Sequence, residues 1–497
     1  MRRGISFLFV LLLSSLLLQI LPACTGCGGG GSLIVEITSH NDGDSVTGSK
    51  TVTISGTIRN AESVASVTVD HNGTESDATF DNRSFSAEVT LDDRDNLITI
   101  TVVTGSGKTG SDSVNLGYPF IRLTTFQQAS VVIGQADFTL QAVNRGGAPG
   151  ANTIAGGYGN PFVHNGVLYL PDSSNNRVLG FNAVPTINGV SADFVLGQSD
   201  FLSASSGDLA NEMSWPITII VYSGKMIIAD ESSNRVLIWN TVPTSTQVPA
   251  DVVVGQAGFG ASASSCSQNG LNNPYSVFVV DDKLIVTDLN NNRVLIWNSI
   301  PTTNGEPADI VLGQNSFTNC IGNDDDQNRA PDGNPTSRTL AQPTDIWSDG
   351  TRLIIADSEG NNRLLIWNSF PTSNFTPADV VIGQPDMTSG DPGLSSRDLD
   401  FPAFIFSNGN QLIVADGDNH RVLIWDTIPT TDYAPADKVL GQSDFTKGQS
   451  DDLDQDGFND GAASNRTFDF PFGLNVIGDK LIVSDNQNSR FLIFQEQ

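Results

Sequence analysis

Basic residues, histidine and glutamate are scarce in this sequence. Its 497 residues include 25 Lys and Arg against 55 Asp and Glu, which gives a net charge of −30 at pH 7. A protein of this charge repels the phosphate backbone, so the composition excludes nucleic acid as a partner. Only nine of the acidic residues are Glu, whereas Asp, Gly and Pro are frequent. Because Glu favours helices and the other three favour turns, we expect an all-β protein.

The few histidines and the missing catalytic motifs restrict the chemistry further. His40 and His71 fall in the first predicted domain, which leaves His164 and His420 for the rest of the chain. Two histidines do not make a multi-histidine metal site. The sequence also contains no Gly-x-Ser-x-Gly elbow and no His-Glu-x-x-His motif, so the common hydrolase signatures are lacking.

The one long apolar run lies at the N-terminus. Two Arg residues precede residues 5–21, and the run ends in Leu21-Pro22-Ala23-Cys24. A basic start, an apolar centre and a small residue before the cut are typical of a secretory signal, here residues 1–23. The ending resembles a bacterial lipobox, which implies a lipid on Cys24. An uncleaved membrane anchor is the alternative, because a run of this length nearly spans a bilayer.

Either interpretation places the rest of the chain outside the cytoplasm. The Gly-rich segment 24–32 predicts a flexible tether. We therefore expect an exported protein, lipid-anchored at the bacterial cell envelope, at the outer membrane or cell surface. Its contact with the membrane is expected through the lipid anchor alone.

Residues 33–117 predict a first β-domain. Short β-type runs lie at 33–37, 51–56, 64–69, 84–91 and 97–103, separated by Gly, Asn and Asp turns, which is typical of a β-sandwich. The motifs that carry a resemblance are Asp42-Gly43-Asp44-Ser45-Val46, Ile54-Ser55-Gly56-Thr57, Ser84-Phe85-Ser86 and Asn96-Leu97-Ile98. They resemble bacterial Ig-like modules of the glucodextranase type. No chemical motif is evident in this domain, so we interpret it as a spacer.

A repeated Gly-Gln pair organises the remainder, at intervals of 63, 58, 58, 70 and 58 residues. The glycines are Gly134, Gly197, Gly255, Gly313, Gly383 and Gly441. In each period one apolar run ends in Asp and the next begins with Arg. These pairs are Asp172/Arg177, Asp230/Arg235, Asp288/Arg293, Asp357/Arg363, Asp416/Arg421 and Asp485/Arg490. A fixed period of strands and turns indicates a propeller or a solenoid.

Each period contains about four β-type runs, as a propeller blade does. In the third period they are expected at 275–280, 283–287, 293–297 and 309–313. The pattern Asp-x-x-Asn-x-Arg-Val-Leu is similar to the NHL repeat, and residues 416–423 match it most closely. The resemblance covers residues 125–497 and implies a β-propeller. His420 is then the histidine of that repeat and not a catalytic residue.

The order of the motifs predicts how the ring closes. The first Gly-Gln strand, at 131–135, precedes every Asp/Arg pair, and the last repeat ends without such a strand. Six blades result if the N-terminal strand completes the last one, which also removes the open sheet edges. We therefore predict a six-bladed propeller closed by an N-terminal strand, and a monomer.

The Asp/Arg pairs suggest either a functional ring of charges or a structural bridge in every blade. We favour the bridge, because buried charges need partners and a role repeated in all blades is typical of packing.

An enzyme is the alternative function. Six-bladed propellers of similar type include calcium-dependent lactonases and a zinc-dependent amidating lyase, with ligands on the innermost strands. The resemblance thus implies a calcium- or zinc-dependent hydrolase or lyase acting at the central tunnel. The matching positions here are Asn160, Thr218, Ser276, Asp345, Phe404 and Gly473. Because a catalytic metal needs three or more converging donors and this set has one carboxylate, Asp345 is the only catalytic candidate.

We favour a surface-anchored interaction protein without catalysis, whose partner is a protein or a carbohydrate. Loops on a rigid ring are suited to binding. The loops after the Gly-Gln strands differ most among the repeats, and the longest are 315–340 and 443–468.

Two cysteines predict a disulfide. Cys266 follows Gly255 by eleven residues and Cys320 follows Gly313 by seven, so both lie in corresponding loops of adjacent repeats. In an exported chain such a pair favours a disulfide, and two free thiols are the alternative.

One acidic loop predicts a structural calcium site. Its positions 1, 3, 5, 7 and 9 are Asp452, Asp454, Asp456, Phe458 and Asp460. Side-chain oxygens at this spacing, with the Phe458 carbonyl, can wrap a Ca²⁺ ion, although the Glu of an EF-hand is missing from position 12. The alternative is a solvated acidic loop. A second cluster, Asp324-Asp325-Asp326, is expected to lack this spacing.

Overall fold

The structure is a computed structural model that describes residues 32–40, 46, 51–92, 94–118 and 121–496. The predicted signal peptide 1–23, the lipidation site Cys24 and most of the tether lie outside these residues. All strand pairs are antiparallel, and the helices in the described part are single 3-10 turns: η1 (Val143–Gly146), η2 (Ser173–Asn175), η3 (Glu231–Ser233) and η4 (Leu289–Asn291). Nothing helical in this part has the length and apolar character needed to cross a membrane. The predicted all-β class is confirmed.

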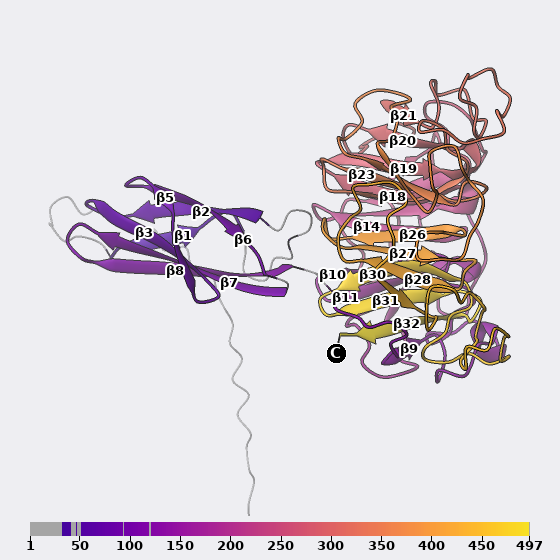
Figure 1. Cartoon of the computed structure of the whole chain (residues 1–497), viewed down its shortest axis with the longest axis horizontal. Helices are drawn as coiled ribbons and strands as arrows, with labels where there is room; N and C mark the ends of the chain where they lie inside the picture. The colour runs from indigo at the N-terminus through magenta and orange to yellow at the C-terminus, as the bar shows by residue number, and fades with distance from the viewer. Residues whose placement is uncertain (1–31, 41–45, 47–50, 93, 119–120, 497) are drawn as a thin grey trace, which may run out of the picture.

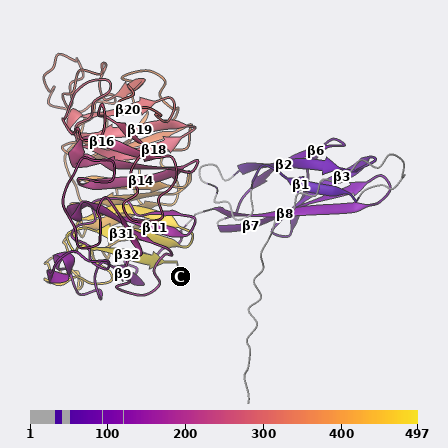
Figure 2. The same ribbon diagram turned by 180° about the vertical axis from the view of Figure 1, so that it is seen from behind.

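A β-sandwich of two four-stranded sheets comes first (Figures 1 and 2). Its strands are β1 (Ile34–Ile37), β2 (Thr51–Arg59), β3 (Val64–His71), β4 (Thr74–Asp77), β5 (Thr79–Phe80), β6 (Ser84–Thr90), β7 (Arg94–Thr104) and β8 (Thr109–Tyr118). The sheets have the orders β1-β2-β6-β5 and β4-β3-β7-β8. Buried residues alternate along β2 as the predicted pattern requires, and Ile54, Phe85 and Ile100 lie in a core formed by this domain alone.

Three strands of the sandwich were not expected from the sequence. β4 and β5 are short and exposed, and β8 is mostly polar, with Val114 and Leu116 as its buried apolar residues. β8 nevertheless pairs along its whole length with β7. The strongly apolar partner strand therefore determines the pairing, which a residue-by-residue pattern does not show.

Six further four-stranded sheets form the blades of a propeller, numbered here 1 to 6 in chain order. The first strands are β10 (Phe162–His164), β14 (Pro216–Tyr222), β18 (Pro274–Val280), β22 (Pro343–Ser348), β26 (Pro402–Ser407) and β30 (Pro471–Ile477). The second strands are β11 (Val167–Asp172), β15 (Lys225–Asp230), β19 (Lys283–Asp288), β23 (Leu353–Asp357), β27 (Leu412–Asp416) and β31 (Lys480–Asp485). First strands of successive blades contact one another, so they are innermost.

The third and fourth strands complete each blade. The third strands are β12 (Arg177–Phe181), β16 (Arg235–Trp239), β20 (Arg293–Trp297), β24 (Arg363–Trp367), β28 (Arg421–Trp425) and β32 (Arg490–Gln495). The outer strands are β13 (Phe194–Leu196), β17 (Val252–Val254), β21 (Ile310–Leu312), β25 (Val380–Ile382), β29 (Lys438–Leu440) and β9 (Val131–Ile133). Third strands are buried on both sides, because neighbouring blades pack against both faces.

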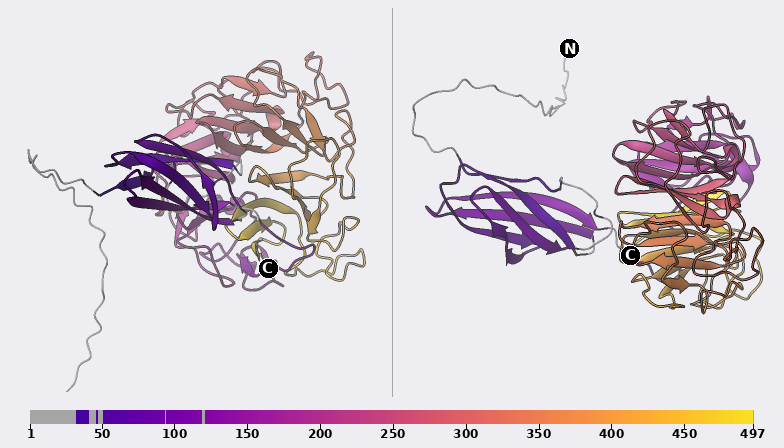
Figure 3. Two further views of the ribbon diagram at one scale, coloured as in Figure 1. Left: turned by 60° about the vertical axis from the view of Figure 1, so that its left-hand side comes forward. Right: turned by 90° about the horizontal axis from the view of Figure 1, so that it is seen from above.

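The ring closes as predicted. β9, from the start of the propeller, pairs with β32 at its end, with Ile133 opposite Phe491 and Val131 opposite Ile493. The two strands lie side by side in Figures 1 and 2, and the blades follow one another round the ring in Figure 3. Blade 6 therefore has no free outer edge on β32.

The topology separates the two faces of the propeller. In blade 3, Pro274 of β18 lies opposite Asp288 of β19, and Asp288 lies opposite Arg293 of β20. The outer strand also ends at this edge, because β21 is antiparallel to β20. The loop to the next blade therefore crosses this face. We call it the loop face: it carries the loops after the Gly-Gln strands, the Asp/Arg turns and the starts of the innermost strands.

Candidate functional site

The Asp/Arg pairs anchor the loop face. In all six blades the Arg Nε donates to the Asp Oδ2 at 2.6–2.8 Å, and both side chains are fully buried. The guanidinium of Arg293 also binds two loops, because it donates to the Phe317 carbonyl at 2.5 Å and to the Ser267 carbonyl at 2.8 Å. Burial raises the pKa of Asp288, and the charge of Arg293 opposes this shift. These pairs are structural, as interpreted from their repetition, and their additional role is to hold the loops.

A second repeated device links neighbouring blades. Asn292 has a positive φ of 51°, and its Oδ1 accepts from the Gln342 amide of the next blade at 3.0 Å. In blade 5 the equivalent residue is His420, whose Nδ1 accepts from the Phe470 amide at 3.0 Å. Burial lowers the pKa of His420, which suits this acceptor role. His420 is thus the structural residue of its repeat.

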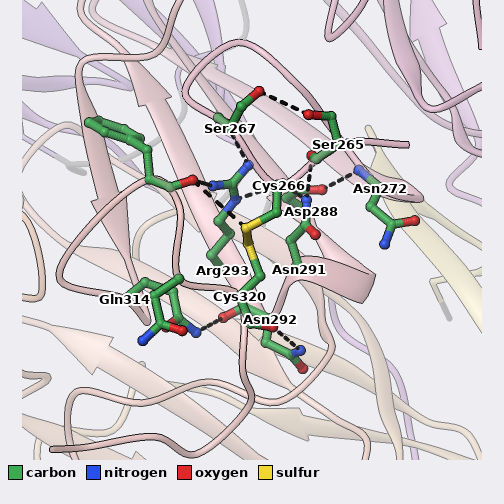
Figure 4. The surroundings of a disulfide bond; sticks show 12 residues. Ser265, Cys266, Ser267, Asn272, Asp288, Asn291, Asn292, Arg293, Gln314 and Cys320 are labelled. Carbon is green, nitrogen blue, oxygen red and sulfur yellow. Dashed lines mark hydrogen bonds and ion pairs between the residues drawn. A yellow bond between two sulfur atoms is a disulfide. The ribbon is translucent and has the colours of Figure 1, made fainter. Parts of the chain in front are cut away.

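The predicted disulfide is present in the loop face (Figure 4). Cys266 and Cys320 are bonded across the loops that lead to blades 3 and 4, with a Cα–Cα distance of 6.3 Å. The bond lies beside the Arg293 guanidinium, which holds the same two loops (Figure 4). A covalent link and a buried cation therefore fix one pair of adjacent loops together.

The polar residues of the innermost strands are occupied by contacts between blades. Asp345 is 4% exposed; its Oδ1 accepts from the Ser276 hydroxyl at 2.5 Å and its Oδ2 from the Ile405 amide at 2.8 Å. Asn160 also contacts the next blade: its Nδ2 donates to the Ile219 carbonyl at 3.3 Å and its Oδ1 accepts from the Ile219 amide at 2.9 Å. Burial raises the pKa of Asp345 to about 7, because no cation lies beside the carboxyl to oppose desolvation. Asp345 joins blades 3, 4 and 5.

Aromatic rings fill the axis of the ring at this level. Tyr275 of blade 3 lies 5.8 Å from Phe472 of blade 6, measured between ring centroids, and 6.4 Å from Phe404 of blade 5. Phe404 and Phe472 are 5.2 Å apart. Two glycines allow the backbones to approach, since a Cβ on Gly473 would lie 1.8 Å from the Gly159 carbonyl oxygen. Blades on opposite sides of the ring therefore meet through side chains, and the expected tunnel is plugged.

Half-buried residues lie next to this plug on the loop face, in a region that we call the mouth. It is formed around the residues that precede the innermost strands, of which five have positive φ: Trp215, Asn273, Gln342, Phe401 and Phe470. Trp215 packs on Tyr158, with centroids 5.1 Å apart, and both rings are half-buried. The turn residue Glu231 lies beside Trp215, because its amide donates to the Trp215 carbonyl at 3.3 Å.

Each of two acidic loops brings three carboxylates together. In the predicted loop these are Asp452, Asp454 and Asp460, whose oxygens lie within 4.8 Å of one another. Asp456 and Phe458 lie in the same loop but outside this group; Asp456 accepts from the Phe458 amide at 2.9 Å.

The second acidic loop corrects the prediction made for it. Asp324, Asp326 and Asp332 form an equivalent group within 4.8 Å. The spacing is shared, with Asn328 in place of Asp456 at position 5. Asp325 makes this segment look like a plain run of acids, which hides the alternation in the sequence. Corresponding hydrogen bonds form, from the Asp325 amide to Asp332 at 2.6 Å and from the Leu453 amide to Asp460 at 2.8 Å.

Both acidic loops are inserts in the loop face. Loops 315–342 and 443–470 are each eleven residues longer than loop 257–273. Within the described part of the chain, groups of three potential metal ligands occur at these two places. The carboxylate spacing suits Ca²⁺, which prefers oxygen ligands.

Comparisons with known proteins add little to this picture. No protein-family model and no curated protein matches the sequence. A candidate 6-phosphogluconolactonase from Bacteroides fragilis is 12% identical with a TM-score of 0.35, covering 88% of this chain and 92% of that one. The PQQ-bound aldose sugar dehydrogenase from Streptomyces coelicolor is 15% identical with a TM-score of 0.37, covering 70% and 99%. A chain of the nidogen/laminin complex is 13% identical with a TM-score of 0.30, covering 70% and 95%. Likeness at this level assigns no activity to the chain.

Proposed function

We propose that this chain is a surface-anchored interaction protein that binds a protein or carbohydrate partner on the loop face, without catalysis. The observation that carries the proposal is the aromatic plug of Tyr275, Phe404 and Phe472 on the axis. It occupies the place where a tunnel enzyme needs substrate and metal, while the rigid loop face above it offers varied loops.

The domain arrangement supports the same proposal. Strand orders β1-β2-β6-β5 and β4-β3-β7-β8 correspond to the ABED and C′CFG sheets of an Ig-like domain. We take residues 33–117 as such a spacer and residues 125–497 as an NHL-type propeller. Anchored through Cys24 and the tether 24–32, the chain would hold its propeller away from the envelope.

The two acidic loops are proposed to bind structural Ca²⁺. Three carboxylates converge in each, and each loop lies within one of the two longest segments of the loop face. A bound ion would offset the repulsion between those carboxylates and stiffen the loops that face a partner.

The alternative is a calcium- or zinc-dependent hydrolase or lyase, and one observation favours it. Asp345 is a buried carboxyl on an innermost strand with a pKa raised to about 7, a value that suits a general base. It stands alone, however, because Ser276 and Ile405 occupy its oxygens.

Capture from intact bacterial cells and extracellular matrix tests the proposed function. The full chain is immobilised and compared with a variant in which residues 324–333 and 452–461 are replaced by Gly-Ser linkers. We expect a saturable partner that binds the full chain and binds the variant less. Capture of no saturable partner by the full chain, or hydrolysis of a lactone by the full chain that Asp345→Asn abolishes, would contradict the proposal. Equal capture by both chains would place the partner on the loop face outside the two acidic loops.

A further inference from the structure

The mouth of the loop face combines aromatic rings with a polar group that has no partner. We define the mouth as Tyr158, Trp215, Glu231, Tyr275 and Asn486. The three rings form a continuous half-buried surface, because Tyr158 packs on Trp215 and both tyrosines contact the ring of Phe472. Rings exposed in this way offer their faces to a ligand.

Asn486 is the unsatisfied group. It is 2% exposed, and neither its Oδ1 nor its Nδ2 has a hydrogen-bond partner. Buried amides are normally paired, so an orphaned one requires an explanation. Side chains at the equivalent turn position point to the start of the next blade's innermost strand, as Ser173 donates to the Pro216 carbonyl and Ser358 to the Pro402 carbonyl, both at 2.6 Å.

Asn486 is therefore directed toward blade 1, where Tyr158 lies. A Cβ added to Gly156 would lie 2.8 Å from Ser174 Oγ, 3.1 Å from Tyr158 Cε2 and 3.3 Å from Asn486 Oδ1. The amide oxygen and the edge of the ring thus converge on the same place. Gly156 is buried, and the absence of a side chain there leaves space between the Asn486 amide, the Tyr158 ring and the Ser174 hydroxyl.

The charges at the mouth are negative and uncompensated. Glu231 has no ion pair among the described residues: its oxygens accept from the neutral Ser232 hydroxyl and Asn273 Nδ2, and burial raises its pKa. Burial also raises the pKa of Tyr275, and the nearby charges of Glu231 and Glu359 add to the shift. The repeat arginines do not neutralise this surface, because each is fully buried and bound to its own Asp.

We propose that the mouth binds a lysine or arginine side chain of a protein partner, with the cation over the faces of Tyr158 and Trp215. This inference rests on the proposed function and narrows its partner to a basic protein segment. The ammonium or guanidinium group donates to Asn486 Oδ1 and pairs with Glu231. A neutral glycan could use the rings but would leave the carboxylate without a cation.

Titration of the full chain with a blocked tetralysine peptide tests the proposal, with the peptide acetylated on all four side chains as the uncharged probe. Heat of binding and tryptophan fluorescence are measured together. We expect saturable binding of tetralysine that weakens with added salt, and none of the acetylated peptide. Trp215→Ala and Glu231→Gln should each weaken binding by about tenfold.

Asp282→Asn is the matched control. It removes one exposed acid from the hairpin between β18 and β19, on the face opposite the mouth. It should change binding by less than about twofold, because exposed charges at that distance are screened. Thermal melting of each variant verifies its fold.

Three outcomes would overturn the inference. These are no saturable binding of tetralysine, equal weakening by Asp282→Asn and Glu231→Gln, or stronger binding of cellotetraose than of tetralysine. The proposed function is tested separately by the capture experiment. If the full chain captures a partner and the two mouth variants capture it equally well, the inference fails while the proposed function stands.

Discussion

Each repeat arginine makes one ion pair and also binds loop carbonyls, so single residues control the stability of the loop face. Five of the six arginines hold two loops, whereas Arg235 donates to carbonyls of one loop, at 207–212. Arg293 donates to Asp288 and to carbonyls of the loops that lead to blades 3 and 4. The same geometry in six blades explains why the pair is repeated without variation. An ion pair buried to this extent contributes mainly when its loss leaves a charge unpaired.

Replacing Arg293 by Met should therefore destabilise the propeller by about 3–5 kcal/mol, because Asp288 is left buried without its cation. Urea unfolding followed by tyrosine and tryptophan fluorescence measures the loss. Lys438→Met removes the partly exposed pair with Asp426 and should cost less than about 1 kcal/mol. Similar losses for the two variants would contradict the structural role of the buried pair.

The pH dependence of stability should report Asp345. Its pKa is about 7 in the folded protein against an ordinary value of 3.8, so the folded state binds the proton more tightly. The stability that this difference in pKa contributes is fully present below the ordinary pKa of 3.8. It is lost as the pH rises through about 7. Other acids such as Asp230 shift in the same direction, so the comparison must be made with a variant.

Asp345→Asn keeps this position neutral at every pH. Its amide oxygen can accept from the Ile405 amide and its NH₂ can donate to Ser276. We expect the melting temperature of the wild type to fall relative to the variant between about pH 5 and pH 8. Parallel curves across that range would show that Asp345 stays ionised in the folded protein.

At the scale of elements, several links tie neighbouring loops of the loop face together. The Cys266–Cys320 disulfide closes a segment with a sequence separation of 54 residues. Adjacent loops are further joined by the buried arginines and by Asn residues such as Asn292. Rigid loops lose less conformational entropy on binding, which suits an interaction surface.

Removing the disulfide with the pair Cys266→Ser and Cys320→Ser should lower the free energy of unfolding by about 2–4 kcal/mol. The unfolded chain gains freedom when the link is lost, whereas the folded loops keep their Arg293 contacts. Denaturant unfolding of the two chains measures the difference. No change in unfolding midpoint would mean that the loops are held by their hydrogen bonds alone.

Calcium should bind at two sites, one in each acidic loop. Calorimetric titration of the chelator-treated chain is expected to show two ions with dissociation constants on the order of 10⁻⁴–10⁻³ M, and a higher melting temperature. Asp454→Asn should remove one site and Asp326→Asn the other. Absence of heat, or a stoichiometry unchanged by these variants, would mean that both loops are simply solvated.

At the scale of the whole molecule, a short N-terminal strand holds the ring closed. β9 supplies the outer strand of blade 6, and residues that precede it pack in the same core as β30 and β31. The sandwich has a separate core that includes no propeller residue. The two domains therefore contribute to stability independently, and the propeller depends on its own first strand.

Deleting residues 125–137 should lower the melting temperature of the propeller and promote aggregation, because the edge of β32 becomes unpaired. A chain without residues 33–118 retains β9 and serves as the control, with an unchanged propeller transition. Calorimetry measures the melting temperature of the propeller in both deletion variants and in the intact chain. Equal melting temperatures for the β9 deletion and the intact chain would contradict closure by this strand.

Much of the architecture follows from the sequence alone because it depends on local patterns and on chain order. The repeated Gly-Gln, Asp and Arg residues predict the strands, their number per blade and the six blades. The position of the first Gly-Gln strand ahead of the first Asp/Arg pair predicts closure. The disulfide follows similarly, since Cys266 and Cys320 come eleven and seven residues after the glycine of a Gly-Gln pair, which places them in corresponding loops of neighbouring blades.

The functional surface depends on contacts that only the tertiary structure decides. Tyr275, Phe404 and Phe472 are far apart in the chain and meet because three blades direct them to one axis. The orphaned amide of Asn486 likewise becomes recognisable only once blade 6 lies beside blade 1. Repeats determine backbone geometry, which is local and uniform, whereas a site requires different side chains to converge from distant strands.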